Sequence, residues 1–301
     1  MSWREFLFAG YGYDKTGPYF LLDESGGQQR EKMYFDSVAA TVEKLERRFC
    51  VGTYDLDTFK TKPCRDRAAL EPQAKDARCG RCLREIGFNP AFYNASAVSP
   101  KQERYNMTPH VVYMAYFSPK HVKIGIASEK RYSVRLLEQG ARAAVVLAKF
   151  GDAYAARALE ERLCAVQGFL ERLTSDAKLG LLISGQYYYE RAKSDLLKMI
   201  EQHYDYEPAG ELMDLTPYYF YGKTPPVSSG VYRADGGGDM VSGRLIGMIG
   251  DTVIISQSEG DDGALFAVPV KKYVSHIVRI YYNEVKIKYS HEARQLTFGD
   301  L

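Results

Sequence analysis

Four cysteines gather in a short part of the chain that has little apolar sequence of its own. Cys50, Cys64, Cys79 and Cys82 fall within 33 residues, and the last two enclose the dipeptide Gly-Arg. A CxxC turn lets two thiolates reach one ion, and zinc takes four soft ligands in a tetrahedron. Residues 50–110 are poor in aliphatic side chains, so this segment needs a staple to stay folded. We therefore expect the four cysteines to bind a structural zinc ion.

Two other interpretations of these cysteines are open: a redox-active CxxC pair, or unrelated buried thiols. A thioredoxin-like pair should open a helix that follows a strand in a βαβ unit, and no such pattern precedes Cys79. A catalytic zinc usually has His among its protein ligands, and no His lies between Cys50 and Cys82. The fifth cysteine, Cys164, lies beside the apolar stripe of a predicted helix and is interpreted as a core thiol.

The composition is that of a globular protein and excludes a disordered or collagen-like chain. The 301 residues include 40 Lys and Arg and 38 Asp and Glu, which leaves a net charge of +2. This length corresponds to two or three domains. The first residues lack the apolar core of a secretory signal, and no stretch is apolar for long enough to span a membrane. We expect a cytoplasmic protein with reduced thiols and no membrane partner.

The pattern of apolar residues and turns predicts an α+β fold in three regions. Residues 1–109 form an N-terminal β module that carries the zinc site, residues 110–207 form an αβ core, and residues 208–301 form a linker and a small C-terminal β barrel or sandwich. A short helix is expected from Ser37 to Arg48. Short strands are expected at residues 6–8, 19–22, 241–249, 252–256, 264–270 and 276–282.

The central region has the clearest pattern. Its expected elements are strands at 111–117, 122–126 and 143–150 and helices at 133–139, 152–173 and 190–203. The first two strands form a hairpin, and Gly140 ends the helix at 133–139. Asp152 is the expected N-cap of the long helix, in which Leu159 and Leu163 belong to an apolar stripe.

Two strands of this hairpin carry Val-Val-Tyr, ending at Tyr113, and Lys-Ile-Gly, ending at Gly125, and the two helices that follow carry Arg135 and Glu160. This order resembles the GIY-YIG nuclease domain. In that family the first strand carries G-I-Y, the second Y-I-G, the next helix an Arg and a later helix a metal-binding Glu. The resemblance implies a GIY-YIG-like αβ core, in which Lys123 stands where the family has the Tyr of its second motif.

The resemblance also implies hydrolysis of a phosphodiester with a divalent metal ion. Glu160 would hold Mg²⁺ or Mn²⁺, Arg135 would stabilise the developing phosphate charge, and Tyr113 with Lys123 would orient or deprotonate water. Helix geometry favours Glu160 over Glu161, because Glu161 points about 200° away from the start of the apolar stripe, into solvent.

Five further residues near the hairpin are candidate substrate-binding residues. Gly125 belongs to the second motif, and Arg131 is a rival of the helical Arg. Gln139 either lines a substrate groove or is a surface residue beside the helix end. His110 and His121 flank the first strand of the core and are secondary candidates, because a lone His is usually structural or exposed.

The architecture as a whole resembles an uncharacterised bacterial family that joins an N-terminal cysteine cluster, a GIY-YIG-like core and a C-terminal β region. The resemblance spans most of residues 50–280. It rests on the segments Val122–Ile126, Leu137–Ala141 and Gly243–Gly250. It implies an architecture and supplies no activity.

Positive charge is concentrated in two segments of this nearly neutral chain. Residues 111–150 hold seven Lys and Arg against two Asp and Glu, and residues 44–88 hold eleven against seven. Such segments could bind the phosphate backbone of DNA or RNA, or could simply be solvated faces. The first hypothesis is a nucleic-acid-processing, metal-dependent nuclease. The alternatives are a non-catalytic DNA- or RNA-binding protein and an enzyme that acts on a small molecule in the nuclease-like groove.

Overall fold

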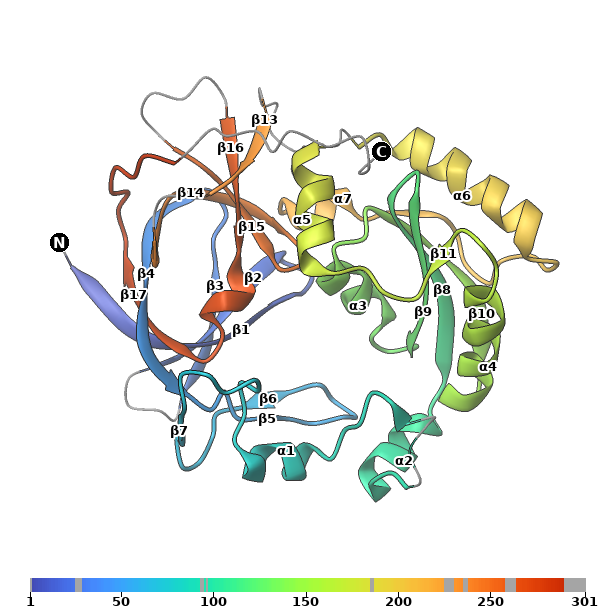
Figure 1. Ribbon diagram of the computed structural model, residues 1–301, viewed down its shortest axis with the longest axis horizontal. Helices are drawn as coiled ribbons and strands as arrows, with labels where there is room; N and C mark the ends of the chain where they lie inside the picture. Colours follow the sequence, from blue (N-terminus) through green and yellow to red (C-terminus); the bar gives the residue numbers. More distant parts are fainter. Residues whose placement is uncertain are drawn as a thin grey trace.

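The chain folds into a mixed α+β structure in which two large sheets are accompanied by helices (Figure 1). The predicted mixture of strands and helices is thereby confirmed. The structure is a computed structural model, and it describes residues 2–24, 29–92, 95, 97–184, 187–224, 230–234, 238–257 and 264–289.

The larger sheet takes strands from both ends of the chain. Its strand order is β13-β16-β15-β14-β4-β17-β1-β2-β3, with β7 paired to β4. These strands are β1 (Trp3–Tyr13), β2 (Pro18–Glu24), β3 (Arg30–Tyr34), β4 (Val38–Phe49), β7 (Ala69–Leu70), β13 (Gly230–Arg233), β14 (Met240–Ile249), β15 (Thr252–Ser256), β16 (Ala264–Pro269) and β17 (His276–Tyr281). Strands β14–β17, expected in a small C-terminal barrel or sandwich, therefore share a sheet with β1–β4, and the three-domain division stays a prediction.

The helix predicted from Ser37 to Arg48 is wrong, because these residues form most of strand β4 (Val38–Phe49). β4 lies between β14 and β17, and Val42 pairs with Val241 on one side and with Ile280 on the other. Each partner strand supplies a ladder of backbone hydrogen bonds and a surface for the buried side chains. Tertiary pairing of this kind overrides a weak local helix preference.

The smaller sheet contains the hairpin that the sequence predicts. Its order is β11-β9-β8-β10-β12, and its strands are β8 (His110–Ser118), β9 (His121–Ser128), β10 (Ala143–Phe150), β11 (Phe169–Leu170) and β12 (Met213–Asp214). β8 and β9 pair in antiparallel register with Tyr113 opposite Gly125. The predicted strands at 111–117, 122–126 and 143–150 are confirmed.

Strand β8 is buried on both faces, so its alternate side chains enter two different cores. Val112 and Met114 pack in the core formed with α4 and α6, whereas Val111 and Tyr113 pack in the core shared with α3, α5 and the larger sheet. This explains why the strand reads as a continuous apolar run rather than an alternating one. The helices are α1 (Gly80–Ile86), α2 (Pro100–Asn106), α3 (Tyr132–Gln139), α4 (Ala153–Cys164), α5 (Ser175–Ser184), α6 (Tyr189–His203) and α7 (Thr216–Tyr219).

The long helix predicted from the sequence begins at the expected residue and ends before the expected one. Asp152 is the N-cap of α4, and its carboxylate accepts a hydrogen bond of 2.8 Å from the backbone N–H of Ala155. The helix ends at Cys164 rather than at residue 173. Gly168 then takes a positive φ of 105°, which suits glycine, and Phe169 begins a short parallel strand beside β9. The chain leaves the helix because the open edge of β9 offers backbone partners.

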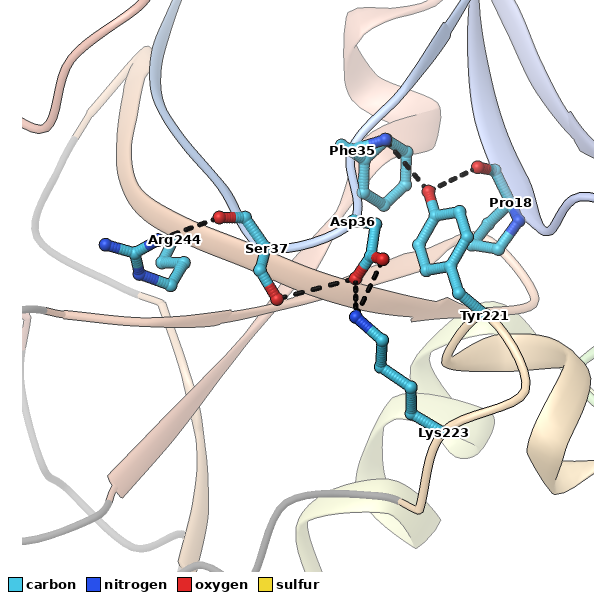
Figure 2. A network of polar contacts seen from close by, with 7 residues as sticks. All are labelled: Pro18, Phe35, Asp36, Ser37, Tyr221, Lys223 and Arg244. Atoms are coloured by element: carbon cyan, nitrogen blue, oxygen red, sulfur yellow. Dashed lines mark hydrogen bonds and ion pairs between the residues drawn. The ribbon is translucent and has the colours of Figure 1, made fainter.

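A polar network joins the segment after α7 to the N-terminal strands, as Figure 2 shows. The Tyr221 hydroxyl donates to the carbonyl of Pro18 at 2.6 Å and accepts from the backbone N–H of Phe35 at 2.9 Å. Nearby, the Lys223 ammonium lies 2.7 Å from the carboxylate of Asp36. These contacts attach the chain that leaves the smaller sheet to the edge of the larger one.

Candidate functional site

The four cysteines predicted to act together lie together. Cys50 follows β4, Cys64 follows the short strand β6 (Thr61–Lys62), Cys79 is the N-cap of α1, and Cys82 is in the first turn of that helix. Their Sγ atoms all lie within 4.8 Å of one another, and three of the four residues are buried. A set of thiols this close could hold a metal ion such as zinc.

Backbone donors and a glycine shape the cysteine cluster. The Cys50 sulfur accepts hydrogen bonds from the backbone N–H groups of Gly52 at 3.3 Å and Cys79 at 3.2 Å. Burial raises the pKa of Cys50, and these two hydrogen bonds oppose that rise. Gly52 has a φ of 82°, and a side chain on it would collide with the carbonyl of Lys62 in β6, which pairs with β5 (Thr53–Tyr54). The glycine thus lets the two short strands close over the cysteines.

Arg48 holds the loop that joins the second and third cysteines. Its Nη1 atom donates to the backbone carbonyls of Glu71 at 3.1 Å, Pro72 at 2.8 Å and Ala74 at 2.9 Å. Because Arg48 belongs to β4, these bonds fix the loop to the larger sheet. The cysteine cluster is therefore anchored by the sheet as well as by any ion it binds.

Tyr113, a predicted catalytic residue, is packed inside the protein. Its side chain is 1% exposed, and its ring lies directly over Gly125, where a Cβ atom would come within 2.6 Å of the hydroxyl. The hydroxyl accepts a hydrogen bond of 2.5 Å from Nε2 of Gln139. Burial raises the pKa of Tyr113, so the phenol stays protonated at neutral pH.

Glu160 is buried and lies in an ion-pair cluster, whereas Glu161 is exposed, as the helix geometry predicts. Its carboxylate is 2.6 Å from Nη1 of Arg157, whose Nη2 lies 3.5 Å from the carboxylate of Glu171. Burial raises the pKa of Glu160, and the charges of Arg157 and Lys123 oppose that rise. We name Lys123, Arg157, Glu160 and Glu171 the α4 cluster.

Lys123 closes the α4 cluster from strand β9. Its Nζ atom donates to the backbone carbonyl of Glu171 at 2.5 Å. Burial lowers the pKa of Lys123, and the charge of Glu160 opposes this effect while Arg135 adds to it. Arg157 and Glu171 are not among the site residues that the sequence predicts. Arg157 precedes Glu160 by three residues on one helix, and this spacing predicts the ion pair between Arg157 and Glu160.

The two rival arginines differ in their surroundings. Arg131 lies 2.7 Å from the carboxylate of Glu138, and its guanidinium lies 5.1 Å from the centre of the Phe59 ring. Arg135 lies 3.6 Å from the same Glu138, its side chain is 48% exposed, and its charge acts on both Tyr113 and Lys123. Of the two arginines, Arg135 is therefore the one whose charge acts on Lys123 of the α4 cluster.

The remaining candidate residues are held locally. Nδ1 of the buried His110 lies 2.8 Å from the carbonyl of Thr108, and Nδ1 of His121 lies 2.7 Å from the Ser118 hydroxyl. Gln139 is buried and borders a cavity at the end of α3. In the part of the chain that the structure describes, neither histidine forms a hydrogen bond or ion pair with Glu160 or Lys123.

These observations define a mixed α+β protein with a four-cysteine cluster that could hold a metal ion. The chain belongs to the family described as protein of unknown function DUF2797, whose model matches residues 49–276. The match contains all four cysteines and the α4 cluster, and it confirms the expectation of an uncharacterised family. Searches of curated proteins and of solved structures found no significant match. Among the described residues, no helix is long and apolar enough to cross a membrane.

Proposed function

We propose that the chain is a nucleic-acid-processing protein of GIY-YIG type that hydrolyses phosphodiester bonds with the help of a divalent metal ion. One observation carries the proposal: Lys123 of β9 and Glu160 of α4 lie in one cluster, joined through Glu171 and Arg157. The charge of Arg135 on α3 also acts on Lys123. Converging, half-buried groups with shifted pKa values are characteristic of catalytic sites. The match of these residues to the GIY-YIG pattern gives the convergence its chemical interpretation.

The α4 cluster contains ligands of the kind that Mg²⁺ or Mn²⁺ prefers, since Glu160 and Glu171 both offer carboxylate oxygens. When bound, such an ion would polarise a phosphoryl oxygen and lower the pKa of a coordinated water. In the structure, Arg157 forms ion pairs with both of these carboxylates. An arriving phosphate would offer Arg157 a bidentate partner and so release Glu160 to the ion.

The chain's own residues have separate roles in this proposal. Lys123, with its lowered pKa, would exchange a proton with the attacking water or the leaving oxygen. The exposed guanidinium of Arg135 would stabilise negative charge on the phosphate. Tyr113 would act as a positioning residue. Its buried hydroxyl accepts a hydrogen bond from the Gln139 amide, and its ring packs directly against strand β9 at Gly125.

We further propose that the cysteine cluster holds a structural zinc ion. Four thiols complete a tetrahedral shell and leave no open position for a substrate, which is the arrangement of structural sites. The ion would join the end of β4 to α1 in a segment whose own buried cluster consists of the cysteines, with only Ala68 and Leu70 packed against them among the described residues.

The experiment is a cleavage screen with supercoiled plasmid and with single- and double-stranded oligonucleotides, in Mg²⁺, Mn²⁺ or EDTA. We expect metal-dependent cleavage that Glu160→Gln abolishes. Glu161→Gln is the matched control, because this exposed neighbour lies on the same helix and should retain activity. Circular dichroism of both variants separates lost chemistry from lost folding.

Cleavage that survives Glu160→Gln would contradict the proposal. Salt-dependent binding of DNA or RNA without cleavage in any metal would instead support the non-catalytic alternative. If neither binding nor cleavage is found, the remaining hypothesis is an enzyme that acts on a small molecule.

A further inference from the structure

A second feature lies apart from the α4 cluster. A cavity of about 210 Å³ is enclosed by the turn between β8 and β9, the end of α3, one side of α5 and the start of α6. Neither Lys123 nor Glu160 lines it. It therefore calls for its own explanation.

Three cationic side chains line this cavity, and no Asp or Glu does: Arg142, Lys178 and Arg191. Within the described part of the chain, no carboxylate lies within ion-pair distance of any of the three. Cations on a protein surface commonly pair with neighbouring acids or remain in solvent. Three that face one concave site without an acid create a positive field that suits an anion.

Arg142 is the deepest of the three. Its Nε atom is shielded from solvent and has no hydrogen-bond partner among the described residues. Its guanidinium carbon lies 4.5 Å from the centre of the Tyr187 ring, which fixes the plane of the guanidinium. Asp214 acts on Arg142 only from a distance, because its carboxylate is engaged by the Tyr187 hydroxyl at 3.3 Å and the Thr216 N–H at 3.0 Å.

Lys178 and Arg191 complete the charged lining. The Lys178 ammonium lies 5.5 Å from the Phe117 ring centre, and burial lowers the pKa of Lys178 while Asp251 opposes that shift. Arg191 is exposed in the first turn of α6, at the rim. Leucines of α5 and the aromatic ring of Tyr187 supply apolar walls.

We propose that this cavity binds the phosphate group of a nucleoside monophosphate, with Arg142 and Lys178 as inner anchors and Arg191 at the mouth. A phosphate monoester carries up to two negative charges, so it balances three cations better than a carboxylate does. The aromatic and aliphatic walls suit the flat, partly apolar base of such a ligand. The proposal goes beyond phosphodiester hydrolysis, since the two sites share no charged residue.

A link between the two sites runs through Gln139. This residue lines the cavity, and its Nε2 atom donates to the hydroxyl of Tyr113 in the proposed catalytic region. A ligand in the cavity would therefore contact the residue that holds Tyr113.

The test is isothermal titration calorimetry of the full chain with AMP, inorganic phosphate and adenosine. We expect AMP to bind, adenosine not to bind, and inorganic phosphate to compete with AMP. Added NaCl should weaken AMP binding. Arg142→Gln should weaken it about tenfold or more, as expected for loss of a charge-assisted hydrogen bond. Lys198→Gln, an exposed cation on α6 outside the cavity, is the matched control and should bind AMP normally.

Thermal unfolding without ligand separates a ligand anchor from a structural arginine. Because Arg142 is a half-buried cation with a shielded Nε atom and, among the described residues, no carboxylate within ion-pair distance, Arg142→Gln should leave the melting temperature unchanged or raise it. Failure of wild-type protein to bind AMP or phosphate would overturn the proposal, and so would normal binding by Arg142→Gln. Equal affinity for AMP and phosphate would overturn the nucleoside part. Glu160→Gln should bind AMP normally, so this result is independent of the nuclease proposal.

Discussion

Removal of the Arg157 guanidinium is the sharpest test of how the α4 cluster is held together. Arg157 and Glu160 lie 2.6 Å apart, and their side chains are only 16% and 7% exposed. Arg157→Gln removes the charge and keeps a polar side chain. Lys123 is then the remaining cation known to act on the buried Glu160 carboxylate. The variant therefore leaves a buried negative charge with reduced compensation.

The magnitude follows from this burial. Removing one partner of a buried ion pair typically costs 3–5 kcal/mol, and the remaining effect of Lys123 places our expectation near the lower end, at about 3 kcal/mol at neutral pH. That is a large part of the ~5–15 kcal/mol that stabilises a typical domain. Arg157→Gln combined with Glu160→Gln removes both charges and should recover most of the loss.

The loss should depend on pH, because it requires Glu160 to be ionised. Burial raises the folded-state pKa of Glu160 above its ordinary value of 4.5, so the folded chain binds this proton more tightly than the unfolded chain. The resulting stabilisation is present below the unfolded pKa and is lost as pH rises through the folded pKa. Without Arg157 the folded pKa rises further. The loss of unfolding free energy caused by Arg157→Gln should therefore be small at about pH 4 and reach its full size at about pH 8.

Urea unfolding followed by circular dichroism at both pH values measures these differences as shifts in midpoint at constant slope. Arg162→Gln is the matched control, since this exposed arginine lies on the same helix and should change stability by less than about 0.5 kcal/mol. A cost for Arg157→Gln below about 1 kcal/mol, or an equal cost at both pH values, would refute the argument.

Three further predictions concern the rest of the fold. Gly125→Ala should cost about 1–3 kcal/mol in urea unfolding because its Cβ meets the Tyr113 hydroxyl, and full stability would contradict the packing described. Cys64→Ser should lower both the zinc content measured by atomic emission and the melting temperature, and chelation of wild-type protein should lower the melting temperature similarly; unchanged values in both would contradict a structural zinc. Tyr221→Phe should lower the free energy of unfolding by about 1–3 kcal/mol, because two hydrogen bonds are lost. Lys223→Met removes an exposed ion pair and should cost less than about 1 kcal/mol. Equal costs for the two variants would contradict this ranking.

Features that depend on neighbouring residues were predictable from the sequence. The spacing of Cys79 and Cys82 places two thiols on one turn, and the structure brings the other two cysteines beside them. The position of Glu160 on the inner face of α4 follows from helical geometry alone. The end of α3 at Gly140 follows from the left-handed conformation that glycine adopts at helix ends.

Features that depend on distant partners were not predictable in this way. The segment of β4 has enough helix-forming residues to suggest a helix, but the ladders from β14 and β17 make it a strand. The α4 helix ends early because β9 accepts Phe169 as a parallel neighbour. Helix α5, which carries Lys178 to the cavity, was also absent from the sequence prediction.

The sequence by itself determined the chemistry available to this protein: a set of four thiols, a hairpin followed by a helix, and an acid on the buried side of the next helix. Only the tertiary structure decided which groups meet. Arg157 neutralises Glu160, Tyr113 is enclosed by Gly125, and Arg142 joins cations from α5 and α6 around one cavity. The physical reason is that backbone geometry sets local spacing over a few residues, whereas burial and pairing depend on segments that fold together from opposite ends of the chain.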